Sequence, residues 1–267
     1  MEPFWTTISI PVGETRHWEL GPLAFWVRHT KGEWHVASIM TPDRSQDDRW
    51  TLAVPSAFPD DLEYERFAFN SQEGDDTLSL KPEFPDRSII SKPLSRVEIP
   101  SNSTASFFCR VSLCVKLVAG RENSPRTLTT LALANLSRSW FGTPLEGEAC
   151  YASSTNAARD HLELQPFPYR VVCPVTIINR SSEPLPFERI CIRVNHLKIY
   201  QGEQYLWSNE IRVSKSSTFE VSQVTYGSGA PSTEPNAAEI AQARIKVSPG
   251  GILLRTFNNL RKTIEIH

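Results

Sequence analysis

The chain has 267 residues, of which 40% are hydrophobic and 22% charged, and its formal net charge is −2. This composition is typical of a globular protein and excludes a disordered or fibrous chain. No run approaches the roughly 20 apolar residues of a membrane-spanning helix, so we expect no direct membrane insertion. The start, Met1–Trp5, lacks the basic and apolar pattern of a signal peptide, which predicts a cytoplasmic protein.

Charge is distributed unevenly along the chain. Residues 1–93 carry a net charge of −7 and the remainder carries +5, which favours two units with different surfaces. The basic side chains are spread over many segments instead of being gathered in one patch. A nucleic-acid partner is therefore not expected.

The first third of the chain alternates apolar and polar residues, as strands do. Alternation over Leu23–Arg28 and Trp34–Ile39, separated by Lys31-Gly32, predicts a β-hairpin. Further strands are predicted at Trp50–Val54, Leu62–Phe69 and Thr77–Leu80. Strands at this spacing without helices between them indicate a sandwich or barrel.

Four prolines between Pro82 and Pro100 mark a domain boundary. We place it near residue 93, giving an N-terminal domain of residues 1–93 and a C-terminal domain of residues 94–267. Each is expected to be a β-sandwich-like domain of antiparallel strands, so the predicted fold class is all-β.

The second domain opens with a long predicted strand, Ser106–Val118, in which Val111, Leu113, Val115 and Leu117 face one way. The other strands expected there are Thr127–Ser137, Glu148–Ser153, Tyr169–Asn179, Phe187–Tyr200, Gln204–Val213 and Thr218–Tyr226. Residues 227–236 are rich in Gly, Ser and Pro and are expected to form a mobile loop. The spacing of Leu253, Phe257, Leu260 and Ile264 predicts a short C-terminal helix.

The five cysteines predict neither disulfides nor a cofactor site. Their number is odd and no Cys-x-x-Cys spacing occurs, so we expect free, buried thiols that act as small apolar residues. Asn102, Asn135 and Asn179 stand in glycosylation-type triplets, which have no consequence in a cytoplasmic protein.

The acidic pairs and the histidines are the candidate metal ligands of the sequence. The pairs Asp47-Asp48, Asp60-Asp61 and Asp75-Asp76 lack the spaced acidic pattern of a calcium loop and are typical of turns. His29 and His35 flank the first hairpin, could face each other across it, and would need further ligands to hold zinc. The interpretation is therefore that no metal is bound.

No pattern of residues identifies a catalytic centre. There is no Gly-x-Ser-x-Gly elbow and no glycine-rich phosphate loop, and carboxylates on strands cannot be paired from sequence. We therefore expect a non-enzymatic protein. A metal-dependent hydrolase built on the Asp-rich loops is the remaining enzymatic alternative.

Aromatic residues give the best indication of a binding site. Trp140-Phe141 sits at a predicted turn around Trp140–Pro144, His196 and Tyr200 fall on one predicted strand, and Trp207 follows on the next. The predicted binding residues are Trp140, Phe141, Arg193, His196, Tyr200 and Trp207. Such residues anchor protein partners or stack on sugars, and they also fill cores. The leading hypothesis is a protein-interaction module, and the alternative is a carbohydrate-type small-ligand module.

Several segments carry a resemblance to a known family. They are Trp18–Leu23, Glu33-Trp34, Leu136–Glu148, Cys173–Val175, Asn179, Arg193–Tyr200 and Leu206-Trp207. Together they resemble an uncharacterised prokaryotic family catalogued as domain of unknown function 432. The resemblance implies a cytoplasmic accessory of small-conductance mechanosensitive channels, so a membrane channel is the protein partner it suggests. It implies no catalytic residues.

Overall fold

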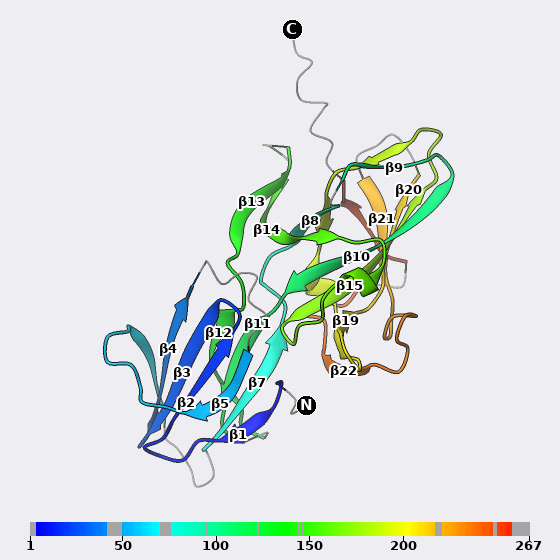
Figure 1. The fold of residues 1–267 in the computed structure, drawn as a ribbon. Coiled ribbons are helices and arrows are strands. Elements are labelled where there is room, and N and C mark those ends of the chain that lie inside the picture. Colours follow the sequence, from blue (N-terminus) through cyan, green and yellow to red (C-terminus); the bar gives the residue numbers. More distant parts are fainter. Residues whose placement is uncertain are drawn as a thin grey trace. The chain divides into compact units, whose positions relative to one another are not determined.

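The computed structural model describes residues 4–41, 50–69, 76–93, 95–121, 123–143, 145, 147–216, 221–247 and 250–257. The chain divides into two compact units (Figure 1). Unit 1 comprises Met1–Glu83 and Ser112–Asn135, and unit 2 comprises Phe84–Val111 and Leu136–His267. Each unit is thus built from two separate stretches of chain, whereas the prolines suggested two continuous domains that meet near residue 93.

Unit 1 contains two antiparallel sheets. The five-stranded sheet has the order β5-β2-β3-β4-β6. Its strands are β2 (Thr15–Leu20), β3 (Leu23–Thr30), β4 (Glu33–Met40), β5 (Trp50–Pro55) and β6 (Tyr64–Ala68). The four-stranded sheet has the order β1-β7-β11-β12. Its strands are β1 (Thr7–Ser9), β7 (Thr77–Glu83), β11 (Cys114–Ala119) and β12 (Arg126–Ala132).

The predicted first hairpin is confirmed as β3 and β4. Along β3, buried residues alternate strictly with partly exposed ones, because successive side chains of a strand point to opposite faces. Phe25 lies on the buried face and stacks on Trp18 of β2, with 4.8 Å between ring centroids. The turn needs Gly32, whose φ of +82° is unfavourable for residues with a Cβ.

Unit 2 contains three sheets. The largest follows the order β22-β18-β19-β15-β20-β21-β23, and β10 also pairs with β15. Its strands are β10 (Ser103–Ser112), β15 (Arg170–Asn179), β18 (Ile199–Gln201), β19 (Leu206–Ser208), β20 (Ile211–Lys215), β21 (Val221–Tyr226), β22 (Ala238–Ala241) and β23 (Ile252–Arg255).

The second sheet of unit 2 has the order β13-β14-β8-β17, and the third is the pair β16-β9. The strands are β8 (Ile89–Pro93), β9 (Val97–Ile99), β13 (Ser137–Gly142), β14 (Gly147–Ala157), β16 (Leu185–Phe187) and β17 (Ile190–Ile192). Most pairs in unit 2 are antiparallel, but β15 runs parallel to β19 and β20, and β14 runs parallel to β8.

The all-β prediction is confirmed. Helical structure in the described residues consists of the 3₁₀ turns η2 (His161–Glu163) and η3 (Val194–His196). Neither turn has the length or apolar content to cross a bilayer. The predicted C-terminal helix is not observed where the chain is described, since Leu253 lies on β23, and Leu260 and Ile264 lie outside the described residues.

The prediction of a single strand over Ser106–Val118 is wrong. The chain leaves β10 after Ser112 and enters β11 at Cys114, and these strands belong to different sheets and different units. Val111, Leu113 and Val115 are all buried, so the alternation of buried residues continues through the break. The apolar pattern therefore gives no sign that one strand ends and another begins.

Two further predicted strands are also divided. The stretch Phe187–Tyr200 contains β17, the turn η3 and β18, and Gln204–Val213 contains β19 and β20. The sequence suggested that His196 and Tyr200 share a strand, but in the structure they do not. Short strands joined by tight turns keep enough alternation to imitate one longer strand.

Candidate functional site

The six predicted binding residues all lie in unit 2 but do not form one surface. Phe141 is buried in a cluster with Ile90, Cys150 and Cys191. Tyr200 and Trp207 face each other across β18 and β19 in a second buried cluster. A single contact surface made from all six residues is therefore not present.

His196 and Arg193 are held by contacts inside unit 2. His196 lies on η3, where its Nδ1 is 3.2 Å from the carbonyl oxygen of Ile245. Arg193 forms an ion pair with Glu148 of β14, and it also donates to the carbonyl of Cys191 at 3.3 Å. Both side chains therefore make contacts that hold neighbouring segments of unit 2 together.

Trp140 is the predicted residue that is most exposed to solvent. It lies on β13, and 47% of it is accessible, whereas Phe141 beside it is buried. The two side chains point to opposite faces because they are neighbours on one strand. The sequence suggested a turn at Trp140-Phe141, but both residues belong to β13, and the turn follows Gly142.

The Trp140 ring is fixed in place by the hairpin that β13 and β14 form. Its indole N–H donates to the carbonyl of Thr143 at 2.9 Å. Gly147 starts the return strand, and a Cβ at that position would overlap the indole ring. The ring therefore packs across the glycine backbone. At the end of the hairpin, Leu145 is 97% exposed.

β13 is an edge strand. It pairs with β14, and no other described strand pairs with it. An edge strand presents a row of backbone N–H and C=O groups that can pair with an added strand. The outward face around it carries Trp140, Arg138 and Tyr151, and the hydroxyl of Tyr151 donates to Asp86 at 2.8 Å. The structure thus brings an exposed tryptophan and an open strand edge together.

Glu148 anchors this hairpin to the rest of its sheet. Besides Arg193, its carboxylate accepts from the Cys191 thiol at 3.5 Å and from Ser88 at 3.4 Å. These partners come from β17 and from the residue before β8. The inward face of β14 is therefore fixed by polar contacts, while the outward face of β13 remains accessible.

Trp207 forms the floor of a separate pocket of about 570 Å³. Its exposure is only 1%. The rings of His161, Tyr205 and Trp207 lie 5.4 to 5.8 Å apart, and the Tyr205 hydroxyl donates to the carbonyl of Leu164 at 2.9 Å. Polar groups complete the rim, namely Gln201, Glu203, Gln204, Thr233, Glu234 and Asn236.

Glu234 closes one side of this pocket. Its carboxylate accepts from the Trp207 indole N–H at 2.5 Å and from the backbone N–H of Glu203 at 2.6 Å. Sequence reasoning missed Glu234, Tyr205 and His161 as pocket residues. Tyr205 and Trp207 could have been paired by their spacing of two within the predicted strand Gln204–Val213, but nothing in the sequence links Glu234 to them.

Loop 227–236 was expected to be mobile, but several hydrogen bonds tie it to neighbouring segments. Besides the contacts of Glu234, the N–H and hydroxyl of Ser232 donate to Glu210 at 2.9 and 2.5 Å. These hydrogen bonds hold the pKa of Glu210 below its ordinary value.

The described residues contain no group of three His, Cys, Asp or Glu side chains placed to hold a metal ion. His29 and His35 lie on opposite faces of their sheet, since His29 pairs with Trp34 and His35 pairs with Arg28. The suggestion that the two histidines could face each other is therefore wrong. Asp47, Asp48 and Asp75 lie outside the described residues.

The five cysteines are free and buried, as predicted. Burial raises the pKa of Cys109 and of Cys173 to about 12, and it also raises the pKa of Cys191. A thiol must lose its proton to act as a nucleophile. These thiols therefore stay protonated at neutral pH and behave as apolar core groups.

Comparison with known proteins gives one match. A family model described as "Protein of unknown function (DUF432)" matches residues 4–262. No curated protein and no solved structure matches the chain.

Proposed function

We propose that this chain, which belongs to the DUF432 family, is a non-enzymatic module that binds an extended segment of a protein partner at the edge of β13. The observation that carries the proposal is the combination of an open strand edge with the exposed ring of Trp140 on the same strand. Such an edge can accept a partner strand by β-augmentation.

The two features have complementary roles. Main-chain hydrogen bonds to β13 would give affinity that depends little on the partner's sequence. Trp140 would supply an anchor, because tryptophan at an interface contributes a large apolar area and an N–H group. The indole is already fixed by Thr143 and Gly147, so little conformational freedom is lost on binding.

The surroundings of Trp140 define the chemistry of the partner segment. Leu145 offers an apolar contact at the hairpin end, and Arg138 on β13 is exposed. The segment that fits is an extended strand with an apolar side chain opposite Trp140 and a carboxylate near Arg138. A polar sugar surface would leave Leu145 without a matching contact.

The partner proposed here is the one that the family resemblance implied, a small-conductance mechanosensitive channel. In that case the protein acts in the cytoplasm and contacts a cytoplasmic segment of the channel. The segment would itself be extended or form an edge strand.

Affinity capture with the cytoplasmic part of such a channel tests the proposal. The double variant Trp140→Ala, Leu145→Ser should lose at least about tenfold in affinity, since anchors of this kind contribute 2 kcal/mol or more. Leu253→Ser is the matched control, because Leu253 is 71% exposed in the same unit but lies on β23. Equal affinity of a folded double variant and the control would overturn the proposal.

The pocket over Trp207 favours a second candidate function, the binding of a small carbohydrate-type ligand. Its volume of about 570 Å³ lies within the range of small-molecule sites. Aromatic rings beside amide and carboxylate groups can contact both the C–H faces and the hydroxyls of a sugar. Titration with oligosaccharides should then change tryptophan fluorescence in the wild type but not in Tyr205→Ala. A panel without any saturable change would exclude this candidate.

A further inference from the structure

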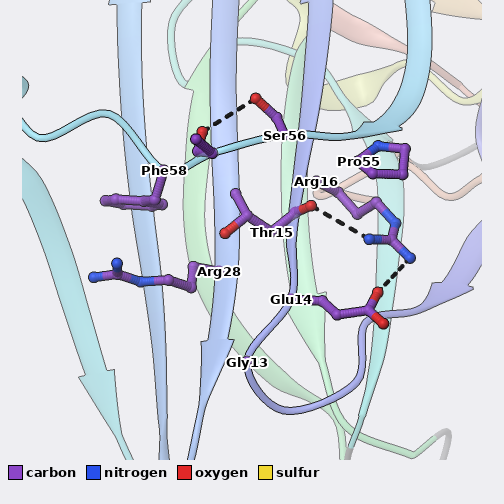
Figure 2. Close-up of a pocket in the computed structure, with 9 residues that line it drawn as sticks. Gly13, Glu14, Thr15, Arg16, Arg28, Pro55, Ser56 and Phe58 are labelled. Atoms are coloured by element: carbon purple, nitrogen blue, oxygen red, sulfur yellow. Dashed lines mark hydrogen bonds and ion pairs between the residues drawn. The ribbon is translucent and has the colours of Figure 1, made fainter.

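The connection between β5 and β6 crosses one face of the five-stranded sheet in unit 1. These strands lie at opposite edges of the sheet, so residues 56–63 must span it. On this path, Phe58 lies over the guanidinium of Arg28, with 4.2 Å from Cζ to the ring centroid. Figure 2 shows the Phe58 ring above the Arg28 side chain and Thr15 between Arg28 and Arg16.

Arg28 begins a chain of hydrogen bonds along this face. Its Nε and one terminal nitrogen donate to Nδ1 of His35, at 3.3 and 2.9 Å. Arginine has no acceptor, so Nδ1 must be unprotonated and the proton of the neutral ring sits on Nε2. That N–H donates to Glu33 at 2.9 Å, and Glu33 also accepts from Arg66 at 2.8 Å.

The positive and negative charges along this chain of hydrogen bonds do not balance. Arg66 is paired with Glu33, and Arg16 is paired with Glu14 at 2.6 Å. Arg28 is half-buried, and its hydrogen bonds go to a neutral imidazole, with no carboxylate within ion-pair distance among the described residues. A cation withdrawn from water is normally paired. Two of its five N–H groups are used, so donors remain for an anion.

Arg28 lines a pocket of about 580 Å³, formed between the start of the connection and the first residues of β2 (Figure 2). Thr15 and Ser56 bring hydroxyl groups to this pocket, and Phe58 brings an apolar ring. The Glu14–Arg16 ion pair also lines the pocket, so the Glu14 carboxylate is already paired with a cation. A guanidinium, two hydroxyls and one ring suit a small molecule with an oxyanion group and an apolar part.

We infer that this pocket of unit 1 is a binding site for an oxyanion, in which Arg28 binds the carboxylate, phosphate or sulfate group and His35 orients the Arg28 guanidinium. The site lies in a different unit from β13 and does not rest on the proposed protein-binding function.

Calorimetric titration with sulfate at pH 7 tests the inference. Arg28→Met should lose at least about tenfold in affinity. Lys31→Met is the matched control, since Lys31 is an exposed cation at the end of the same strand pair, and its affinity should be unchanged.

Arg28→Lys supplies a second readout. Lysine keeps the positive charge but cannot bind an oxyanion with two parallel N–H groups, so the sulfate affinity should lie between those of the wild type and Arg28→Met. This variant carries the test if circular dichroism shows that Arg28→Met is unfolded. The inference is overturned if Arg28→Met binds sulfate as tightly as the wild type, or if Lys31→Met loses as much affinity as Arg28→Met.

Discussion

The indole N–H of Trp207 donates to the carboxylate of Glu234 at 2.5 Å, across 27 residues of sequence. This contact joins β19 to loop 227–236, which is rich in Gly, Ser and Pro. The backbone N–H of Glu203 occupies the second carboxylate oxygen, so both oxygens have partners. The contact therefore fixes one wall of the pocket over Trp207.

Gly202 makes room for that carboxylate, and a substitution there should displace it. A Cβ at Gly202 would overlap the carboxylate group of Glu234. We expect Gly202→Ala to break the Trp207–Glu234 hydrogen bond and to lower the free energy of unfolding by about 1–2 kcal/mol. Gly229→Ala is the control, since a Cβ there meets no atom within 4 Å. Urea unfolding of both variants measures the difference, and equal stabilities would contradict the assignment.

Asn179 is a structural residue, although the sequence shows it only as part of a glycosylation-type triplet. Its side-chain amide donates to the carbonyls of Ile99, Pro100 and Glu183, and its oxygen accepts from Ser181. Asn179→Ala removes these hydrogen bonds, while the carbonyls of Pro100 and Glu183 keep those from Ser103 and Ser181. The change should cost about 2–4 kcal/mol.

The exposed Asn135 belongs to a triplet of the same kind and provides the control for Asn179. Asn135→Ala should change the free energy of unfolding by no more than about 0.5 kcal/mol. Denaturant midpoints of the two variants show whether Asn179 has a structural role that Asn135 lacks. A change below about 1 kcal/mol in Asn179→Ala would show that its hydrogen bonds contribute little.

The buried thiols predict how stability changes at alkaline pH. The folded-state pKa of Cys109 and of Cys173 is raised from about 9 to about 12, so the folded protein keeps protons that the unfolded chain releases. The contribution of these two thiols to the free energy of unfolding is complete below about pH 9 and is lost as the pH rises towards 12. Each thiol should add about 1.4 kcal/mol per pH unit to this decline.

The double variant Cys109→Ala, Cys173→Ala tests this prediction. It should be less stable than the wild type at pH 8, because atoms are removed from the core, but its stability should fall less steeply above pH 9. Urea midpoints measured from pH 8 to 10.5 give both slopes. Parallel curves for variant and wild type would show that the two thiols do not titrate differently in the folded and unfolded states.

The ion pair between Arg193 and Glu148 should be coupled energetically. The Arg193 side chain is 9% exposed and that of Glu148 is 39% exposed, so solvent screens part of the attraction. A double-mutant cycle with Glu148→Gln and Arg193→Met should give a coupling energy of about 1–2 kcal/mol. Additive effects within about 0.5 kcal/mol would mean that the pair does not anchor the hairpin.

The fold class could be predicted because buried and more exposed residues alternate along several of the longer strands, as β3 and β10 illustrate. Strand ends could not be predicted, because burial continues through Leu113 while the chain passes from one sheet to another. The discontinuous unit 1 follows from that passage. No local pattern records which sheet a strand will join.

The candidate site was predicted only in part. Trp140 was identified from its type and its nearness to a turn, but the sequence does not show that β13 is an edge strand, since strand order is set by long-range pairing. Phe141 and Trp207 were proposed for the same surface and lie in the interior. The Arg28–His35 contact was missed because register across the hairpin decides which residues face each other.

Hydrogen–deuterium exchange of β13 with and without the cytoplasmic part of the proposed channel partner tests the central claim most directly. A partner strand added to the edge would protect backbone amides within Ser137–Gly142, which bond to no further described strand in the free protein. We predict slower exchange of these amides in the complex, and no such protection in Trp140→Ala, Leu145→Ser. A complex that forms while β13 exchanges at its free rate would contradict the account.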